Sequence, residues 1–262
     1  MGLLMKLVRS LLLASSVIFT CSVQATIVEF RTSLGNFEVN LFDEITPKTV
    51  ENFLQYVEDE SYHNSVIHRL IPDFVVQGGG FAYTGELPLS VIPAKAAVQN
   101  EPKLSNRKGT IAMAKLENRP NSATNQWFFN LKDNHAGQPQ LDTQNGGFTV
   151  FGQISEQGME ILDAIAALPR FNLGGAASSM PLRNYSTADA AANKPITAEN
   201  LVLIESVVIV DARINTASGL NPVANTLIGQ QPPPENSQDS GGSLFWLVLG
   251  LSGILLLRRR VS

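Results

Sequence analysis

Residues whose side chains could take part in a reaction are concentrated in the stretch SVIHRLIPDFVVQGGGF, from Ser65 to Phe81. Apolar runs on either side of a Pro-Asp pair indicate two short strands, Val66–Ile71 and Phe74–Gln77, followed by three glycines. Arg69 and Gln77 lie among these apolar residues. A permanent cation beside an apolar surface predicts chemistry in which charge is redistributed and no bond is broken.

Other chemistries lack their parts in this chain. No Ser-His-Asp or Cys-His arrangement, no pair of carboxylates in an apolar context and no phosphate-binding loop is visible. His63 and His68 lack a third closely spaced ligand, so we expect neither metal nor cofactor. The net charge of −4, without a basic block outside the C-terminus, indicates no nucleic-acid partner.

Two motifs, in this order, resemble the signatures of the cyclophilin family of peptidyl-prolyl isomerases. The first is His68-Arg69, Ile71-Pro72, Phe74 and Gln77-Gly78-Gly79. The second runs from Gly109 to Ala114 and continues from Asn121 to Phe129. The resemblance covers Thr26 to about Arg213 and implies an enzyme that accelerates rotation about X–Pro bonds of client polypeptides.

The resemblance also implies roles for residues at the matching positions. Arg69 would donate hydrogen bonds to the twisting prolyl amide and Gln77 would orient it. Gln126 and Ala114 would bind the substrate backbone. The proline pocket and its rim would be formed by apolar side chains, namely Phe74, Met113, Phe128, Leu141 and Phe148. Better-known relatives have an aromatic residue where this chain has Gln140, and His or Tyr where it has Phe148, so we expect weak binding of cyclosporin-type ligands.

The elements around these motifs read as mainly β. Alternating apolar residues predict a hairpin of Thr26–Arg31 and Asn36–Phe42. Further strands are expected at Thr110–Ala114, Gln126–Leu131, Phe148–Ile154 and Leu201–Val210, and two helices are expected, one after a Thr46 cap with Pro47 in its first turn and one at Gly158–Leu168. We predict a closed eight-stranded antiparallel barrel capped by two helices, which is also the fold that the resemblance implies.

Both ends of the chain have the composition of targeting segments. Residues 1–25 combine Lys6 and Arg9 with an apolar run and a small-residue end, which predicts a signal peptide and an exported domain over 26–213. Cys21 allows a lipoprotein alternative, although Phe19-Thr20 before it fit such a site poorly. Residues 214–240, with three consecutive prolines, predict a linker.

Residues 241–262 contain Gly241-Gly242, an apolar run and three arginines. The run is about 14 residues, roughly 21 Å of helix, which is short against a hydrocarbon core of ~30 Å. This ending resembles a Gly-Gly type sorting signal of Gram-negative bacteria, which implies cleavage by a rhomboid-type protease and delivery to the cell surface. The alternative is a tail anchor that leaves the domain on the periplasmic face of the inner membrane.

Two other functions are compatible with the sequence. A catalytically weak module could hold proline-containing clients or a partner in the same groove without turnover. A barrel could instead carry a small apolar ligand inside, although the bulky Phe and Ile residues at alternating inward positions argue against an open lumen.

Overall fold

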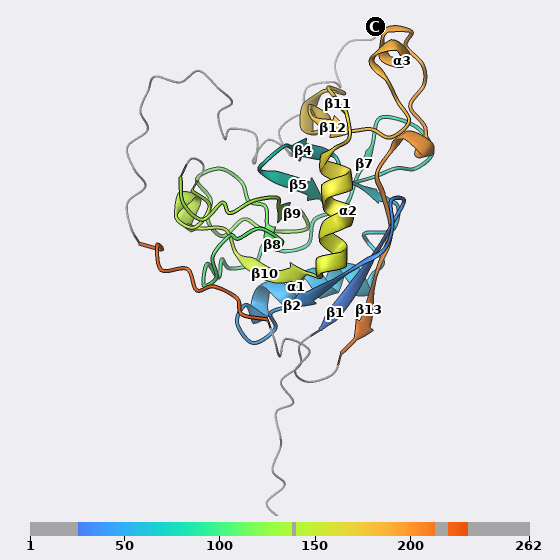
Figure 1. Cartoon of the computed structure of the whole chain (residues 1–262). Coiled ribbons are helices and arrows are strands. Elements are labelled where there is room, and N and C mark those ends of the chain that lie inside the picture. The colour runs from blue at the N-terminus through green and yellow to red at the C-terminus, as the bar shows by residue number, and fades with distance from the viewer. Residues whose placement is uncertain (1–25, 138–139, 213–219, 230–262) are drawn as a thin grey trace, which may run out of the picture.

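The computed structural model describes residues 26–137, 140–212 and 220–229 (Figure 1). The predicted signal peptide, the predicted C-terminal segment 241–262 and most of the predicted linker lie outside these ranges. Within them, no helix is both long and apolar enough to cross a bilayer.

One strongly curled antiparallel sheet dominates the fold (Figure 1). Its hydrogen-bonded order is β4-β5-β9-β8-β10-β2-β1-β13-β3-β6-β7. The strands are β1 (Ile27–Thr32), β2 (Phe37–Leu41), β3 (Ser65–Val66), β4 (Arg69–Ile71), β5 (Val75–Gly78), β6 (Phe81–Ala82), β7 (Ser90–Val91), β8 (Thr110–Met113), β9 (Trp127–Asn130), β10 (Val150–Ile154) and β13 (Leu203–Asp211). A separate hairpin joins β11 (Arg170–Phe171) to β12 (Met180–Pro181).

The curled sheet closes through a single interrupted strand. β3 and β4 follow one another along the chain, yet β3 pairs with β13 whereas β4 pairs with β5. Between them, the Ile67 amide donates to the Val202 carbonyl at 3.0 Å, and the His68 amide donates to the Gln77 carbonyl at 3.2 Å. Counting β3 and β4 as one strand, the ring consists of this strand with β5, β9, β8, β10, β2, β1 and β13, as the predicted eight-stranded barrel requires.

Two helices pack on this sheet, α1 (Pro47–Glu58) and α2 (Glu156–Ala166), and a short α3 (Thr187–Ala191) lies further along the chain. α1 buries Val50, Phe53 and Val57 in the barrel interior, as their spacing predicts. Thr46 is the N-cap residue and Pro47 begins the helix, as predicted, but the Thr46 hydroxyl donates to the Phe42 carbonyl and makes no capping hydrogen bond.

The start of α1 is held by a residue distant in sequence. The Glu101 carboxylate accepts hydrogen bonds from both the amide and the hydroxyl of Thr49, each at 2.9 Å. A carboxylate at this position satisfies an otherwise unpaired amide and lies at the favourable end of the helix dipole. A single-sequence capping rule looks only at local neighbours and therefore could not find it.

Two stretches without a clear sequence pattern turn out to be packed. Residues 171–200, which read as a polar excursion, include α3 and contribute Met180 and Leu182 to a small apolar cluster with Val66 and Phe81. Residues 220–229, inside the predicted linker, form hydrogen bonds with the barrel domain. The prediction of a linker therefore does not hold for 220–229, because the backbone of Val223 and Asn225, the Asn225 side chain and the apolar Leu220 attach this segment to the domain.

Candidate active site

The candidate site is a row of side chains that crosses successive strands on the outer face of the barrel. Arg69 on β4 faces Gln77 on β5. Gln77 faces Phe128 on β9, Phe128 faces Ala112 on β8, and Ala112 faces Val150 on β10. Cross-strand partners have their side chains on the same face of a sheet, so the ladder itself fixes the order of this row.

Hydrogen bonds hold the polar end of the row. Arg69 Nη1 donates to Gln77 Oε1 at 3.0 Å, and Gln77 Nε2 donates to Gln126 Oε1 at 2.9 Å. The Gln77 amide is thereby fixed, with its oxygen toward the guanidinium. A guanidinium has five N–H donors in one plane, so a bond at Nη1 orients the group and leaves donors for a ligand.

Arg69 is a buried cation without an ion-pair partner among the residues that the structure describes. Its exposed fraction is 5%, and none of the ion pairs between described residues includes it. Burial lowers the pKa of Arg69 from its ordinary value to about 10, so the group is still positively charged at neutral pH. A fixed charge with little competition from water interacts strongly with a polar group that is brought beside it.

Apolar residues on the same outer face form a cluster that we call the outer cluster. It consists of Phe42, Phe74, Val75, Leu104, Ala112, Ala114, Phe128, Leu141, Phe148 and Val150. The Phe128 and Phe148 rings meet edge to face, with centroids 5.8 Å apart. Five of the residues expected at the substrate site, Phe74, Ala114, Phe128, Leu141 and Phe148, thus lie together. Val75, which the motif comparison did not single out, belongs to the same set.

Met113 does not join them. It is fully buried in the interior cluster, with Ile111 of the same strand and with Trp127 and Phe129 of β9. Ala112 and Ala114 point to the outer face because side chains alternate along β8. The prediction that Met113 lines the proline pocket is therefore corrected: this side chain packs inside the barrel and not on the outer face.

Gln126 and Ala114 lie at the edge of the row. Gln126 is half-buried, and its carbonyl accepts the Ala114 amide at 2.9 Å. The bond continues the pairing of β8 with β9 by one residue beyond the strands. This position suits the predicted role of both residues in binding an extended substrate backbone.

Lys115, which the sequence analysis did not single out, lies beside the outer cluster. Lys115 Nζ donates to the carbonyls of Asn145 and Gly147, at 2.9 and 2.6 Å, and lies 4.7 Å from the centre of the Phe148 ring. Burial lowers the pKa of Lys115 from 10.5 to about 7. A lysine directly after a buried strand was the available sequence signal.

His68, beside Arg69 in sequence, is suited to a structural role. Its ring is 1% exposed and packs edge to face on Phe81, with centroids 4.9 Å apart. Burial, with a smaller contribution from the Arg69 charge, lowers the pKa of His68 to about 3. A neutral, buried imidazole in this setting is not a proton carrier at neutral pH.

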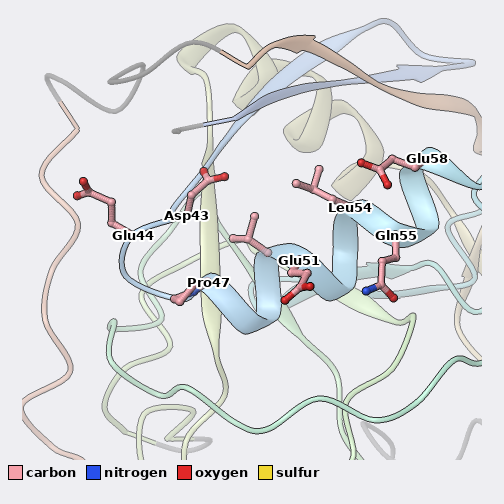
Figure 2. A pocket seen from close by; sticks show the side chains of 8 residues that line it. Asp43, Glu44, Pro47, Glu51, Leu54, Gln55 and Glu58 are labelled. Atoms are coloured by element: carbon pink, nitrogen blue, oxygen red, sulfur yellow. The ribbon is translucent and has the colours of Figure 1, made fainter. Parts of the chain in front are cut away.

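A separate hollow lies against α1 (Figure 2). Its lining includes four carboxylates, those of Asp43, Glu44, Glu51 and Glu58, and includes neither Arg69 nor any member of the outer cluster. Across the described residues, no group of three or more His, Cys, Asp or Glu side chains is arranged to hold a metal ion. The Arg69 row, with its oriented guanidinium beside the outer cluster, is the candidate active site.

The fold and the row define a β-barrel protein with a fixed cation beside an apolar cluster on its outer face. Residues 27–186 match the family model described as "Cyclophilin type peptidyl-prolyl cis-trans isomerase/CLD". The chain belongs to this family.

Curated relatives agree with this assignment. Over 149 residues the chain is 38% identical to a peptidyl-prolyl cis-trans isomerase of Acinetobacter baylyi, covering 57% of this chain and 76% of the relative. It is 43% identical over 139 residues to peptidyl-prolyl cis-trans isomerase cyp18 of Streptomyces antibioticus, covering 53% and 81%. Among solved structures, a Cryptosporidium parvum cyclophilin-type isomerase aligns with a TM-score of 0.49 and 22% identity, over 71% of this chain and 98% of that one.

Proposed function

We propose that this peptidyl-prolyl cis-trans isomerase acts on exported polypeptides and that Arg69 supplies the stabilising charge. Rotation about an X–Pro bond has a barrier of ~18 to 20 kcal/mol because twisting removes the amide resonance. At the top of the barrier the proline nitrogen regains its lone pair and becomes a hydrogen-bond acceptor. A donor fixed beside that nitrogen binds the twisted amide better than either planar form and so raises the rate.

The single observation that carries the mechanism is the bond from Arg69 Nη1 to Gln77 Oε1 at 3.0 Å. It orients the guanidinium in the absence of substrate, so little reorganisation is needed during rotation. The proline ring would bind against Phe74, Phe128, Leu141 and Phe148 of the outer cluster. Gln126 and Ala114 would hold the flanking backbone.

Arg69→Ala tests this mechanism in a polypeptide spanning Thr26 to Gly229. We expect the rate of isomerisation of a Suc-Ala-Ala-Pro-Phe type peptide to fall about 100-fold, the scale of losing one preorganised donor. The free energy of unfolding should fall by only about 1 to 2 kcal/mol, because Gln77 loses one buried bond. Arg69→Lys is the matched control, since it keeps the charge but loses the planar fork of donors, and it should also be slow.

A catalytically weak binding module is the alternative, and the same assay separates the two. A wild-type chain that binds the peptide but relaxes it no faster than buffer would support the module. A loss of activity in Arg69→Ala that only tracks a loss of folded protein would assign Arg69 to stability alone.

The proposed location rests on the two ends of the sequence. The signal-like segment 1–25 supports export, and the ending 241–262 supports attachment to the inner membrane or cleavage by a rhomboid-type protease before surface delivery. Cell fractions can be probed with an antibody to the domain and with a tag at the C-terminus. Loss of the tag from mature surface protein would support cleavage, whereas a retained tag would support the membrane anchor.

A further inference from the structure

Residues 220–229, which we call the strap, lie outside the family match and bind the barrel domain (Figure 1). The Ser105 amide donates to the Val223 carbonyl at 2.8 Å, and the Asn225 amide donates to the Lys103 carbonyl at 2.9 Å. Leu104 of the outer cluster forms an antiparallel bridge with Ala224 of the strap, and Leu220 packs against the same cluster. The strap thus contacts the loop 101–106 and the apolar residues of the candidate site.

Asn225 is the buried residue of an otherwise exposed or half-buried strap, with 8% of its surface exposed. Its Nδ2 donates to the carbonyls of Pro102 at 3.1 Å and Asp142 at 2.8 Å. Its Oδ1 accepts from the amides of Leu227 and Ile228 at 3.0 and 3.1 Å. One side chain therefore both folds the strap and ties it to the loop that begins at Asp142.

That loop is flanked by two members of the outer cluster, Leu141 and Phe148, against which the proline ring is proposed to bind. Leu141 directly precedes Asp142, and the Phe148 amide closes the loop by donating to the Leu141 carbonyl at 2.8 Å. The Asp142 carboxylate accepts from Ser105 Oγ at 2.6 Å and from the Asn106 amide at 2.7 Å. Lys115 binds the same loop at Asn145 and Gly147. The hydrogen bonds at Asp142 thus hold the backbone that positions the side chains of Leu141 and Phe148.

We infer that Asn225 is a positioning residue of the isomerase, through which the strap holds Leu141 and Phe148 in the geometry that binds proline. The inference rests on the proposed substrate site. It assigns a role in substrate binding to a segment beyond the family domain. Loss of the Asn225 contacts should weaken binding of the planar and the twisted prolyl amide equally, because Leu141 and Phe148 contact the proline ring in both states. The preference for the twisted state comes from Arg69, which acts on the nitrogen.

Asn225→Asp tests the inference in the full chain. An aspartate oxygen can still accept from the Leu227 and Ile228 amides, but the two side-chain hydrogen bonds to the Pro102 and Asp142 carbonyls are lost. We expect KM to rise about three- to tenfold with kcat nearly unchanged, which is the signature of lost uniform binding. Val223→Ala, at an exposed strap residue that bonds through its backbone, should leave both constants as in the wild type.

A double-mutant cycle distinguishes positioning from general stabilisation. If Asn225 acts through the pocket wall, Asn225→Asp should change KM by less than about twofold once Phe148→Ala has removed that wall. The ring resonances of labelled Phe148 should also shift in Asn225→Asp and not in Val223→Ala, a readout that does not depend on turnover. A wild-type chain without isomerase activity would count against the proposed function, and a shifted ring would still support the positioning role.

Three results would overturn the inference: constants equal to the wild type, an equal KM effect with and without Phe148, or a fall in kcat at constant KM. If Asn225→Asp does not fold, Leu220→Ala can replace it, because it weakens the strap at its apolar contact with the outer cluster. A rise in KM with kcat nearly unchanged would again support the inference, and a fall in kcat at constant KM would overturn it.

Discussion

Lys115→Met is expected to remove a pH dependence from the stability of the folded chain. Lys115 is 3% exposed, its ammonium group binds two carbonyls beside Phe148, and no ion pair between described residues includes it. Burying an ammonium without a carboxylate disfavours its charged form. Methionine has a similar length and apolar stem and cannot titrate, so the substitution isolates the charge.

The direction follows from the protons bound by the two states. Burial lowers the pKa of folded Lys115 to about 7, whereas an unfolded lysine keeps its ordinary pKa of 10.5. Between these values the unfolded chain binds more protons than the folded chain, so the free energy of unfolding rises with pH. The destabilisation by the buried charge is largest below pH 7 and is absent above pH 10.5, where the lysine is neutral in both states. Each pH unit contributes up to about 1.4 kcal/mol, which gives about 2 to 3 kcal/mol between pH 7.5 and 9.5.

Guanidinium unfolding at several pH values in this window measures the effect. The free energy of unfolding of the wild type minus that of Lys115→Met should rise with pH by the amount above, since other titrating groups are common to both chains. Lys108→Met, at a lysine whose side chain is 52% exposed, controls for the loss of one charge. Parallel pH curves for wild type and Lys115→Met would refute the argument that the buried ammonium is destabilised.

Three further predictions follow from the site. Met113→Ala should lower the free energy of unfolding by about 2 to 5 kcal/mol, measured by denaturation, because it opens a cavity in the interior; a larger effect on KM than on stability would return Met113 to the pocket. Gln77→Leu should lower kcat about tenfold at nearly constant KM in the peptide assay by freeing the guanidinium, and an unchanged kcat would show that Arg69 needs no orienting partner. His68→Gln should flatten the loss of stability that the wild type shows as pH falls from 6.5 toward 3, since folded His68 has a pKa of about 3; an unchanged acid unfolding curve would contradict burial of the neutral ring.

Local patterns predicted the strands of the barrel, and the resemblance to the family motif predicted that Gln77 orients Arg69. The alternation in residues 27–41 predicts the hairpin of β1 and β2, and the apolar spacing after Pro47 predicts the buried face of α1. The motif from His68 to Gly79 brings Arg69 opposite Gln77 because a tight turn at Pro72-Asp73 sets the register of β4 and β5. Short-range geometry of this kind is encoded within a few residues.

The errors come from long-range contacts and from the side of a strand that a residue faces. Met113 and Ala114 are adjacent in the same motif, yet only one can face outward, and the motif alone does not say which. Glu101 at the start of α1 and Asn225 on the loop at Asp142 act across 52 and 83 positions of the chain, respectively. No periodicity within one segment records such a contact, so both emerged only from the three-dimensional arrangement.

The interrupted strand that closes the barrel is also where we expect the molecule to open first. β3 pairs with β13 at two positions, against six for β1 with β13, so the seam at Ile67 and His68 is held by few bonds. Local opening is easiest where bonding is sparse, and this seam continues directly into the strand that carries Arg69. Hydrogen exchange at the Ile67 and His68 amides should therefore measure how often this seam opens and displaces the Arg69 side chain. On warming, activity should fall at a lower temperature than that at which the whole chain unfolds.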